Sequence, residues 1–372
     1  MTLSDAFVDT GNAAVAAAVS KMRDLVVASG GYVNLAARVV ERGGDLRVLC
    51  NASAQEGQML FAIPNELLVP LEGLLWRDGE HGFEADRRGA ALTREQSEML
   101  DRFLEIYNAC DKPATMRAAP TVILAQDAEL AGRMQSIRRM NLPLRQSLAE
   151  HFIATRACRN SAAPGAMSGQ RYLMPLIDFM NHSHSGAEYR HTERDLQVTV
   201  RKAADSDECM LCYSRYIDPL GIAIDHGYVD QGSPYAASTP VMLDIAGFGR
   251  LEIVGRALDS NSDTKPPKPE FREDGLALSH LIFNAAHPLD ALAHLKLTMT
   301  ASGMRRGLDA AMIEKAIPAA LRLICAENKA RLDEFCDYLA TRGELDIAPV
   351  LTGAAHRQLE NLKLAVSRAL AQ

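Results

Sequence analysis

The strongest constraint on the fold is a change of residue pattern late in the chain. Up to residue 258, short apolar segments alternate with turn residues, as in "VNLAARVV", "LRVLCNAS" and "GQMLFAIPNELLVP". Such segments are typical of strands. From residue 276 the sequence is rich in Ala and Leu with helical periodicity, as in "DAAMIEKAIPAALRLICAENKARLDEFCDYLATR". The pattern predicts an α+β chain in which a β-rich part precedes an all-helical part.

Three other segments set the expected boundaries. Residues 1–30 are typical of an N-terminal helix that ends at Gly30-Gly31. Residues 90–160 have helical periodicity, and Thr93 is well suited to cap the first helix of this insert. Residues 259–275, "DSNSDTKPPKPEFREDG", lack apolar periodicity and are typical of an exposed linker or long loop. We therefore expect a β-rich domain over 31–258 and a helical C-terminal domain over 276–372.

Composition narrows the class of protein. Of 372 residues, 48% are apolar and 23% are charged, which excludes wholesale disorder. The net charge of -7 argues against binding to nucleic acid, which normally needs a basic surface. No apolar run reaches the roughly 18 to 20 residues that span a bilayer, and the N-terminus has no basic region typical of a signal peptide. Seven cysteines, an odd number, favour reduced thiols and a cytoplasmic location.

One polar cluster stands out, in "YLMPLIDFMNHSHSGAEYR". The residues alone leave three interpretations open. His182, His184 and His191, with Asp178 or Glu188, are compatible with a metal site, because alternate histidines on a strand share a face. Alternatively, Asn181 and His182 are hydrogen-bonded polar groups at the end of a buried strand. A third interpretation is a binding pocket for an organic cofactor.

A second segment favours the third interpretation. "PLIDFMNHS" (175–183), followed downstream by "CMLCYSRY" and "DHGYVD" (225–230), resembles the motifs of the SET-domain methyltransferases, and within them the RuBisCO large-subunit methyltransferase branch. "GQMLFAIPNELLVP" and "RACR" (156–159) are similar to further segments of that family and follow in its order. The resemblance implies a SET domain of short twisted sheets with a pseudoknot-type core, a helical insert and a helical C-terminal domain.

The resemblance also implies an activity. Members of this family transfer a methyl group in line from S-adenosyl-L-methionine to an amine, here expected to be a protein lysine. A protein or peptide substrate is expected to dock on the helical C-terminal domain; no metal, nucleic acid or membrane is expected. The implied cofactor-binding residues are Leu46, Arg47, Arg159, Asp178, Asn181 and His182. The implied catalytic residues are Tyr213, His226 and Tyr228.

Two positions depart from the family pattern. Gly43 and Gly44 are shifted from the family's glycine motif, so that Leu46 and Arg47 occupy the expected cofactor contact. His226 stands where the family has a tyrosine. An imidazole, with an ordinary pKa of about 6.5, accepts a proton at neutral pH where a phenol does not. This leaves open a different acceptor, such as a histidine or a peptide amine, or a SET-fold binding protein without the usual catalysis.

Overall fold

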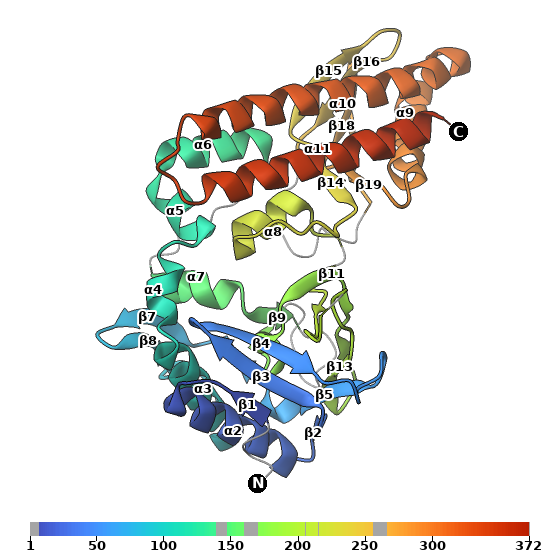
Figure 1. The fold of residues 1–372 in the computed structure, drawn as a ribbon. Coiled ribbons are helices and arrows are strands. Elements are labelled where there is room, and N and C mark those ends of the chain that lie inside the picture. Colours follow the sequence, from blue (N-terminus) through green and yellow to red (C-terminus); the bar gives the residue numbers. More distant parts are fainter. Residues whose placement is uncertain are drawn as a thin grey trace. The chain divides into compact units, whose positions relative to one another are not determined.

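The computed structural model describes residues 7–138, 147–159, 170–204, 206–214, 216–255 and 266–371. The chain forms two compact units, and it crosses between them three times (Figure 1). Unit 1 contains Met1–Ala118 and Arg145–Ser214. Unit 2 contains Ala119–Leu144 and Arg215–Gln372.

Unit 1 is built on small sheets of short strands. Its central four-stranded sheet has the order β12-β13-β5-β2, in which β5 pairs antiparallel with both neighbours. Two three-stranded sheets have the orders β1-β3-β4 and β6-β10-β9, and β7 and β8 form a hairpin. The strands are β1 (Val8–Asp9), β2 (Tyr32–Val33), β3 (Ala37–Arg42), β4 (Asp45–Cys50), β5 (Met59–Pro64), β6 (Val69–Pro70), β7 (Leu75–Gly79), β8 (Gly82–Asp86), β9 (Ala157–Arg159), β10 (Arg171–Leu173), β11 (His182–Ala187), β12 (Arg190–His191) and β13 (Asp195–Thr199).

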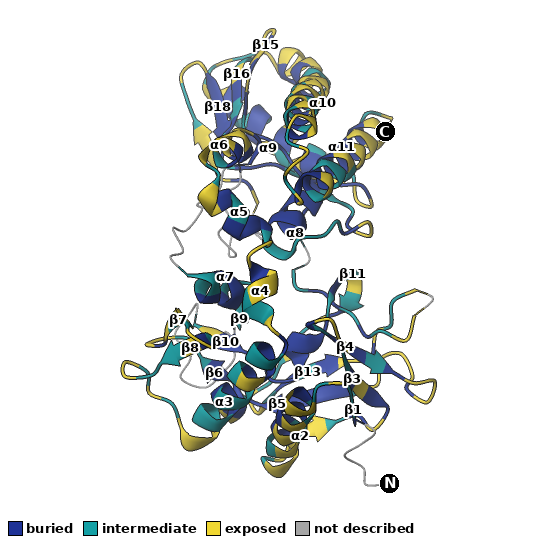
Figure 2. Ribbon diagram, turned by 60° about the vertical axis from the view of Figure 1, so that its left-hand side comes forward, coloured by how far each residue is buried: buried dark blue, intermediate teal, exposed yellow. Residues whose placement is uncertain are grey.

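Helices cover these sheets, and their ends follow local sequence signals. The helices of unit 1 are α2 (Ala13–Ala28), α3 (Arg94–Ala109), α4 (Lys112–Met116) and α7 (Leu148–Ala154), with the short 3-10 turns η1 (Asn65–Leu67) and η2 (Ile177–Phe179). The helix α2 ends before Gly30, whose φ of 79° suits glycine. Thr93 caps α3 in a reciprocal capping box with Gln96. Both α2 and α3 have one buried and one exposed side (Figure 2).

Unit 2 combines a four-stranded sheet, order β15-β16-β18-β17, with helices from two separate parts of the chain. The long helices α10 and α11 pack side by side, and β15 packs on α10 (Figure 1). The helices are α5 (Pro120–Gln126), α6 (Ala128–Ile137), α8 (Pro219–His226), α9 (Leu289–Arg305), α10 (Ala310–Ala340) and α11 (Ala348–Leu370). The strands are β14 (Tyr235–Ala237), β15 (Val241–Ile245), β16 (Gly249–Ile253), β17 (Pro269–Phe271), β18 (Gly275–Leu278) and β19 (Ile282–Asn284).

The mixed α/β architecture, with short sheets and a helical C-terminal region, confirms the predicted fold class. The linker prediction needs correction. Residues 259–265 lie outside the described part of the chain, whereas β17 falls inside the expected loop and β18 begins at its last residue. Because β18 is fully buried and pairs in parallel with β16, its "GLAL" is a strand, and the C-terminal helices begin only at Leu289.

The helical insert is divided between the two units. The helices α3, α4 and α7 belong to unit 1, whereas α5 and α6 pack against α8 and α10 in unit 2. The expected domain boundaries therefore do not coincide with those of the two compact units.

A buried ion pair ties α6 to α8 inside unit 2. The Arg138 guanidinium donates to both carboxylate oxygens of Asp218, with Nη1 at 2.6 Å from Oδ2. Asp218 also caps α8 by accepting from the Gly221 amide at 2.8 Å, and it accepts from the Ala237 amide at 3.3 Å. The two side chains are 3% and 0% exposed. Asp218 therefore joins three separate segments of the unit without contact with solvent.

None of the helices in the described ranges is both long enough and apolar enough to cross a membrane.

Candidate functional site

The candidate site in unit 1 begins with the turn that precedes β11. Leu176 starts this turn with a φ of 62°, an unusual conformation for a leucine, and its side chain is fully buried. Such strain costs on the order of 1–3 kcal/mol and persists only where the surrounding structure holds it. The turn is therefore held in place by its packing.

Asp178 holds the turn from inside. Its buried carboxylate accepts a hydrogen bond from the Tyr107 hydroxyl of α3. Arg156 donates to the Asp178 carbonyl oxygen at 3.0 Å and lies 3.9 Å from the carboxylate. Burial raises the pKa of Asp178, and the neighbouring Arg156 and the Tyr107 hydrogen bond act in the opposite direction. The predicted site residue Asp178 therefore supports the turn from the core.

Arg156 is fixed beside this carboxylate. Its guanidinium carbon lies 5.3 Å from the ring centroid of Phe152 and 5.6 Å from that of Tyr107. The Arg156 Nε is buried and has no hydrogen-bond partner among the described residues. Arg156 thus keeps unused donor capacity in a fixed orientation, which suits an anionic group.

The chain segment 208–213 crosses the turn and binds to it. The Leu211 amide donates to the Asn181 carbonyl at 2.8 Å, and the Tyr213 amide donates to His182 Nδ1 at 2.9 Å. The Tyr213 hydroxyl donates to the Met180 carbonyl at 2.7 Å. This segment makes isolated bridges, including one between His182 and Leu211. Three predicted site residues, Asn181, His182 and Tyr213, are thereby brought together.

The Tyr213 side chain is an uncharged phenol. Burial raises the pKa of Tyr213, with Arg156 opposing and the carboxylates of Asp178 and Asp45 adding to the increase. The hydroxyl therefore keeps its proton at neutral pH, and this proton is directed to the Met180 carbonyl. The oxygen presents its lone pairs without carrying a charge.

Glu208 connects the turn to β4. It accepts from Asn181 Nδ2 at 2.8 Å and lies 3.8 Å from Arg47 Nη1. Arg47 is half-exposed, whereas the neighbouring Leu46 is buried, because successive side chains of a strand point to opposite faces. Arg47 therefore lies at the edge of the cluster, and the Leu46 side chain packs into the core.

The remaining predicted residues are placed as follows. Arg159 ends β9 and pairs with Arg171 of β10, and its side chain lies outside the described part. His226 ends α8, and Gly227 follows with a φ of 78°. The rings of His226 and Tyr228 lie 6.4 Å apart in unit 2.

The three histidines of the metal interpretation are His182, His184 and His191. His182 and His184 alternate along β11, and His191 lies on β12, where burial lowers its pKa. Across the ranges that the structure describes, no group of three or more His, Cys, Asp or Glu side chains is arranged to hold a metal ion.

Sequence reasoning missed Tyr107, Arg156 and Glu208 as site residues. Arg156 belongs to the "RACR" segment that resembled the family, and the resemblance selected Arg159 instead. Tyr107 and Glu208 carry no local signal, because their partners are 71 and 27 residues away in sequence.

No family model matches the sequence, and no curated protein matches it. Among solved structures, the SET domain of LSMT bound to lysine and AdoHcy is similar over 95% of this chain and 91% of that one, at 10% identity and a TM-score of 0.44. Rubisco LSMT bound to AdoMet is similar over 95% and 92%, at 10% identity and a TM-score of 0.43.

Proposed function

We propose that this chain is an S-adenosylmethionine-dependent N-methyltransferase of SET type. The observation that carries the proposal is the crossing of residues 208–213 over the Asp178–His182 turn. This crossing joins the two segments in which the resemblance lies, and it brings Tyr213 to the Met180 carbonyl. The finer proposal is that the acceptor is a protein lysine and that its protein docks on the helices α9, α10 and α11.

The residues of the cluster fit the cofactor. Its amino-acid end carries a carboxylate and an ammonium group, and Arg156 offers a buried, unused guanidinium nitrogen for the carboxylate. Glu208 offers an acceptor at the edge of the turn for a hydroxyl or amine of the cofactor. The Asn181–His182 backbone is held by Leu211 and Tyr213, so that the turn is ordered before a ligand binds.

The cofactor would supply a methyl group on a positively charged sulfur. The protein's part is to align the acceptor amine with it and to exclude water. The neutral Tyr213 oxygen, fixed through its bond to Met180, provides an oriented dipole for the attacking amine or the transferred methyl. A buried approach also lowers the pKa of a lysine acceptor, so that it arrives uncharged.

The position of His226 favours a second candidate. If this imidazole replaces the usual tyrosine in function, the acceptor is a histidine or a peptide amine, or the protein binds without transferring a methyl group. Transfer assays with labelled cofactor, followed by mass spectrometry of the labelled residue, distinguish these outcomes. Label on lysine supports the proposal, and label on another residue type supports the second candidate.

Replacing Asn181 with alanine is expected to weaken cofactor binding roughly tenfold. The change removes the side-chain amide of Asn181, so Glu208 loses the donor that lies at 2.8 Å. The expected loss of binding free energy is of order 1–2 kcal/mol. Isothermal titration of S-adenosylmethionine measures the effect. The matched control is Asn65→Ala, since Asn65 also donates within unit 1, to the Thr192 carbonyl. Absence of binding to the unchanged protein would contradict the proposed function.

A further inference from the structure

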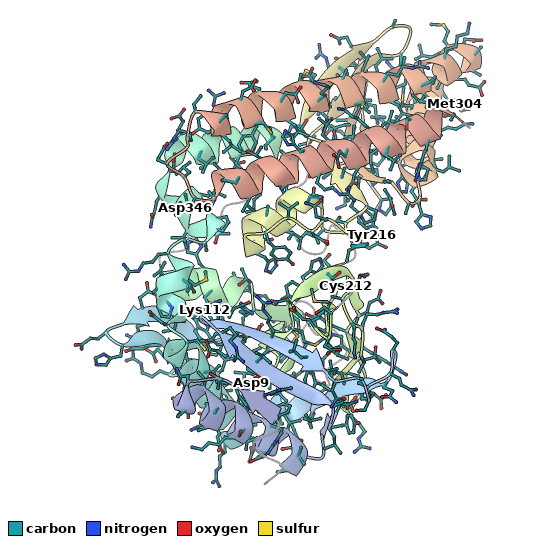
Figure 3. The ribbon with its side chains drawn as sticks, viewed as in Figure 1. Asp9, Lys112, Cys212, Tyr216, Met304 and Asp346 are labelled. Carbon is teal, nitrogen blue, oxygen red and sulfur yellow. The ribbon has the colours of Figure 1, made fainter. Side chains whose placement is uncertain are left out.

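A groove in unit 2 runs along one side of α11. Its volume is about 720 Å³, and it lies between this helix and the segments that adjoin β14 and β19. Both strands pack against α11 (Figure 1). Figure 3 shows the side chains along this helix, which begins shortly after the labelled Asp346. A groove of this size is large enough for a short peptide.

One stripe of α11 forms a wall of the groove. Arg357, Asn361, Leu364 and Arg368 follow at intervals of four, three and four positions, so they share one face of the helix. At 1.5 Å per residue, the backbone positions of Arg357 and Arg368 are about 16 Å apart along the axis. The Leu364 side chain between them is 41% exposed. The stripe therefore has a cation at each end and an exposed apolar side chain in between.

Hydrogen bonds fix α11 to the opposite wall. The buried Asn361 side chain donates through Nδ2 to the Ser233 carbonyl at 2.7 Å and to the Tyr235 carbonyl at 3.0 Å. Arg368 Nη1 donates to the Ala285 carbonyl at 2.6 Å. The residues that line this wall are Gly232, Pro234, Ala285 and Ala286. Because the two walls are joined at both strands, little ordering is needed when a ligand binds.

Positive charge dominates the groove. Three of its lining residues are basic, Arg357, Lys363 and Arg368, and one is acidic, Glu360, although the whole chain has 40 basic and 47 acidic residues. Glu360 Oε2 lies 3.4 Å from Arg357 Nη1, in a weak pair at the surface. Among the residues that the structure describes, Lys363 and Arg368 have no ion-pair partner. The groove therefore attracts a ligand that carries negative charge.

We propose that this groove binds an extended acidic segment of another protein. One carboxylate lies at Arg357, a second lies near Lys363 and Arg368, and an apolar side chain packs on Leu364. Each residue of an extended chain advances about 3.3 Å, so five positions span the distance of about 16 Å between the two arginines. The inference does not depend on methyl transfer, and it assigns a chemistry to the partner that the proposed docking of a substrate leaves open.

Fluorescence anisotropy of a labelled peptide tests the proposal on the full chain. The peptide has eight residues, with glutamate at the second and seventh positions, leucine at the fifth, and serine or glycine elsewhere. Arg357→Gln should weaken its binding about tenfold, as expected for the loss of one charge-assisted hydrogen bond. Arg357→Lys should lose less affinity than Arg357→Gln, because it keeps the charge.

Two further peptides locate the contact. In each of them one of the two glutamates is replaced by glutamine. Arg357→Gln should weaken binding of one of these peptides about tenfold and leave the other within about twofold, because only one glutamate meets Arg357. The peptide that is insensitive to the change identifies this glutamate, and with it the direction in which the segment lies.

The matched control is Arg322→Gln. Arg322 is an exposed residue of α10 in the same unit and does not line the groove, so its loss should leave every affinity within about twofold. Circular dichroism checks that each variant keeps its helices.

Four results would overturn the proposal. They are the absence of peptide binding to the unchanged protein, equal affinities of the Arg357→Gln and unchanged proteins, an equal loss for both single-glutamate peptides, and undiminished binding of a peptide with two glutamines. The last result would assign the groove to an apolar ligand. Each of these results leaves cofactor binding unaffected, so the failure of this inference and the failure of the proposed function are distinguishable.

Discussion

Asp218→Asn is expected to destabilise unit 2 by about 3–5 kcal/mol, the cost typical of removing one partner from a buried ion pair. The amide keeps the size of the carboxyl group and can still accept from the Gly221 amide, so that the cap of α8 is retained. It leaves the Arg138 guanidinium, 3% exposed, without its counter-charge. The loss of stability should therefore come from the missing negative charge beside Arg138 and not from a change in packing.

Urea unfolding followed by circular dichroism of the helices measures this effect. The only tryptophan of the chain, Trp76, belongs to unit 1, so its fluorescence gives a separate signal for that unit. The matched control is Glu334→Gln, which breaks the exposed Arg133–Glu334 pair of the same unit and should cost at most about 1 kcal/mol.

A double variant separates the charge effect from other causes. Arg138→Met combined with Asp218→Asn removes both charges and should be less destabilised than the sum of the two single changes. If Asp218→Asn and Glu334→Gln cost the same, the ion pair does not have the stabilising role assigned to it.

Tyr213→Phe is expected to slow methyl transfer by a factor on the order of 100 and to leave cofactor affinity nearly unchanged. Loss of one oriented polar group that acts at the reacting atoms typically costs this much. The backbone amide of Tyr213 still donates to His182, so the turn should remain in place. The expected effect is therefore on the transfer step and not on binding.

Single-turnover assays with labelled cofactor measure the transfer step, and titration measures affinity. Tyr32→Phe removes a phenol hydroxyl from the same unit at a side chain that is 45% exposed, and it should change neither quantity. An unchanged transfer rate in Tyr213→Phe would remove Tyr213 from the catalytic residues. An equal loss of affinity and rate would instead assign it to the support of the turn.

The features that the sequence predicted well depend on nearby residues. Thr93 and Gln96 define the start of α3 within three positions, and Gly30 marks the end of α2. The β3–β4 hairpin follows from its two glycines, which have φ values of 60° and 81°. In each case the physical cause, a cap or a left-handed backbone, lies inside a short window.

The features that were missed depend on distant partners. The register of β5 against β13 joins residues such as Ile63 and Leu196, and no short pattern specifies that pairing. The "GLAL" of β18 is too short to separate from a helix by periodicity, and its pairing with β16 and β17 makes it a strand. Arg156 was missed because its contact with Asp178 joins residues 22 positions apart, which no local spacing specifies.

The order in which unit 2 is assembled has a consequence during synthesis on the ribosome. Its α5 and α6 are made before residues 145–214 of unit 1, whereas their partners α8 and α10 are made afterwards. Until α10 is made, Leu124, Leu130 and Met134 lack the side chains that bury them, among them Leu332 and Phe335. The nascent chain thus carries an exposed apolar pair of helices while unit 1 completes its fold. A fragment that ends at Ser214 would keep this exposed pair, so isolating unit 1 requires deleting residues 119–144 as well.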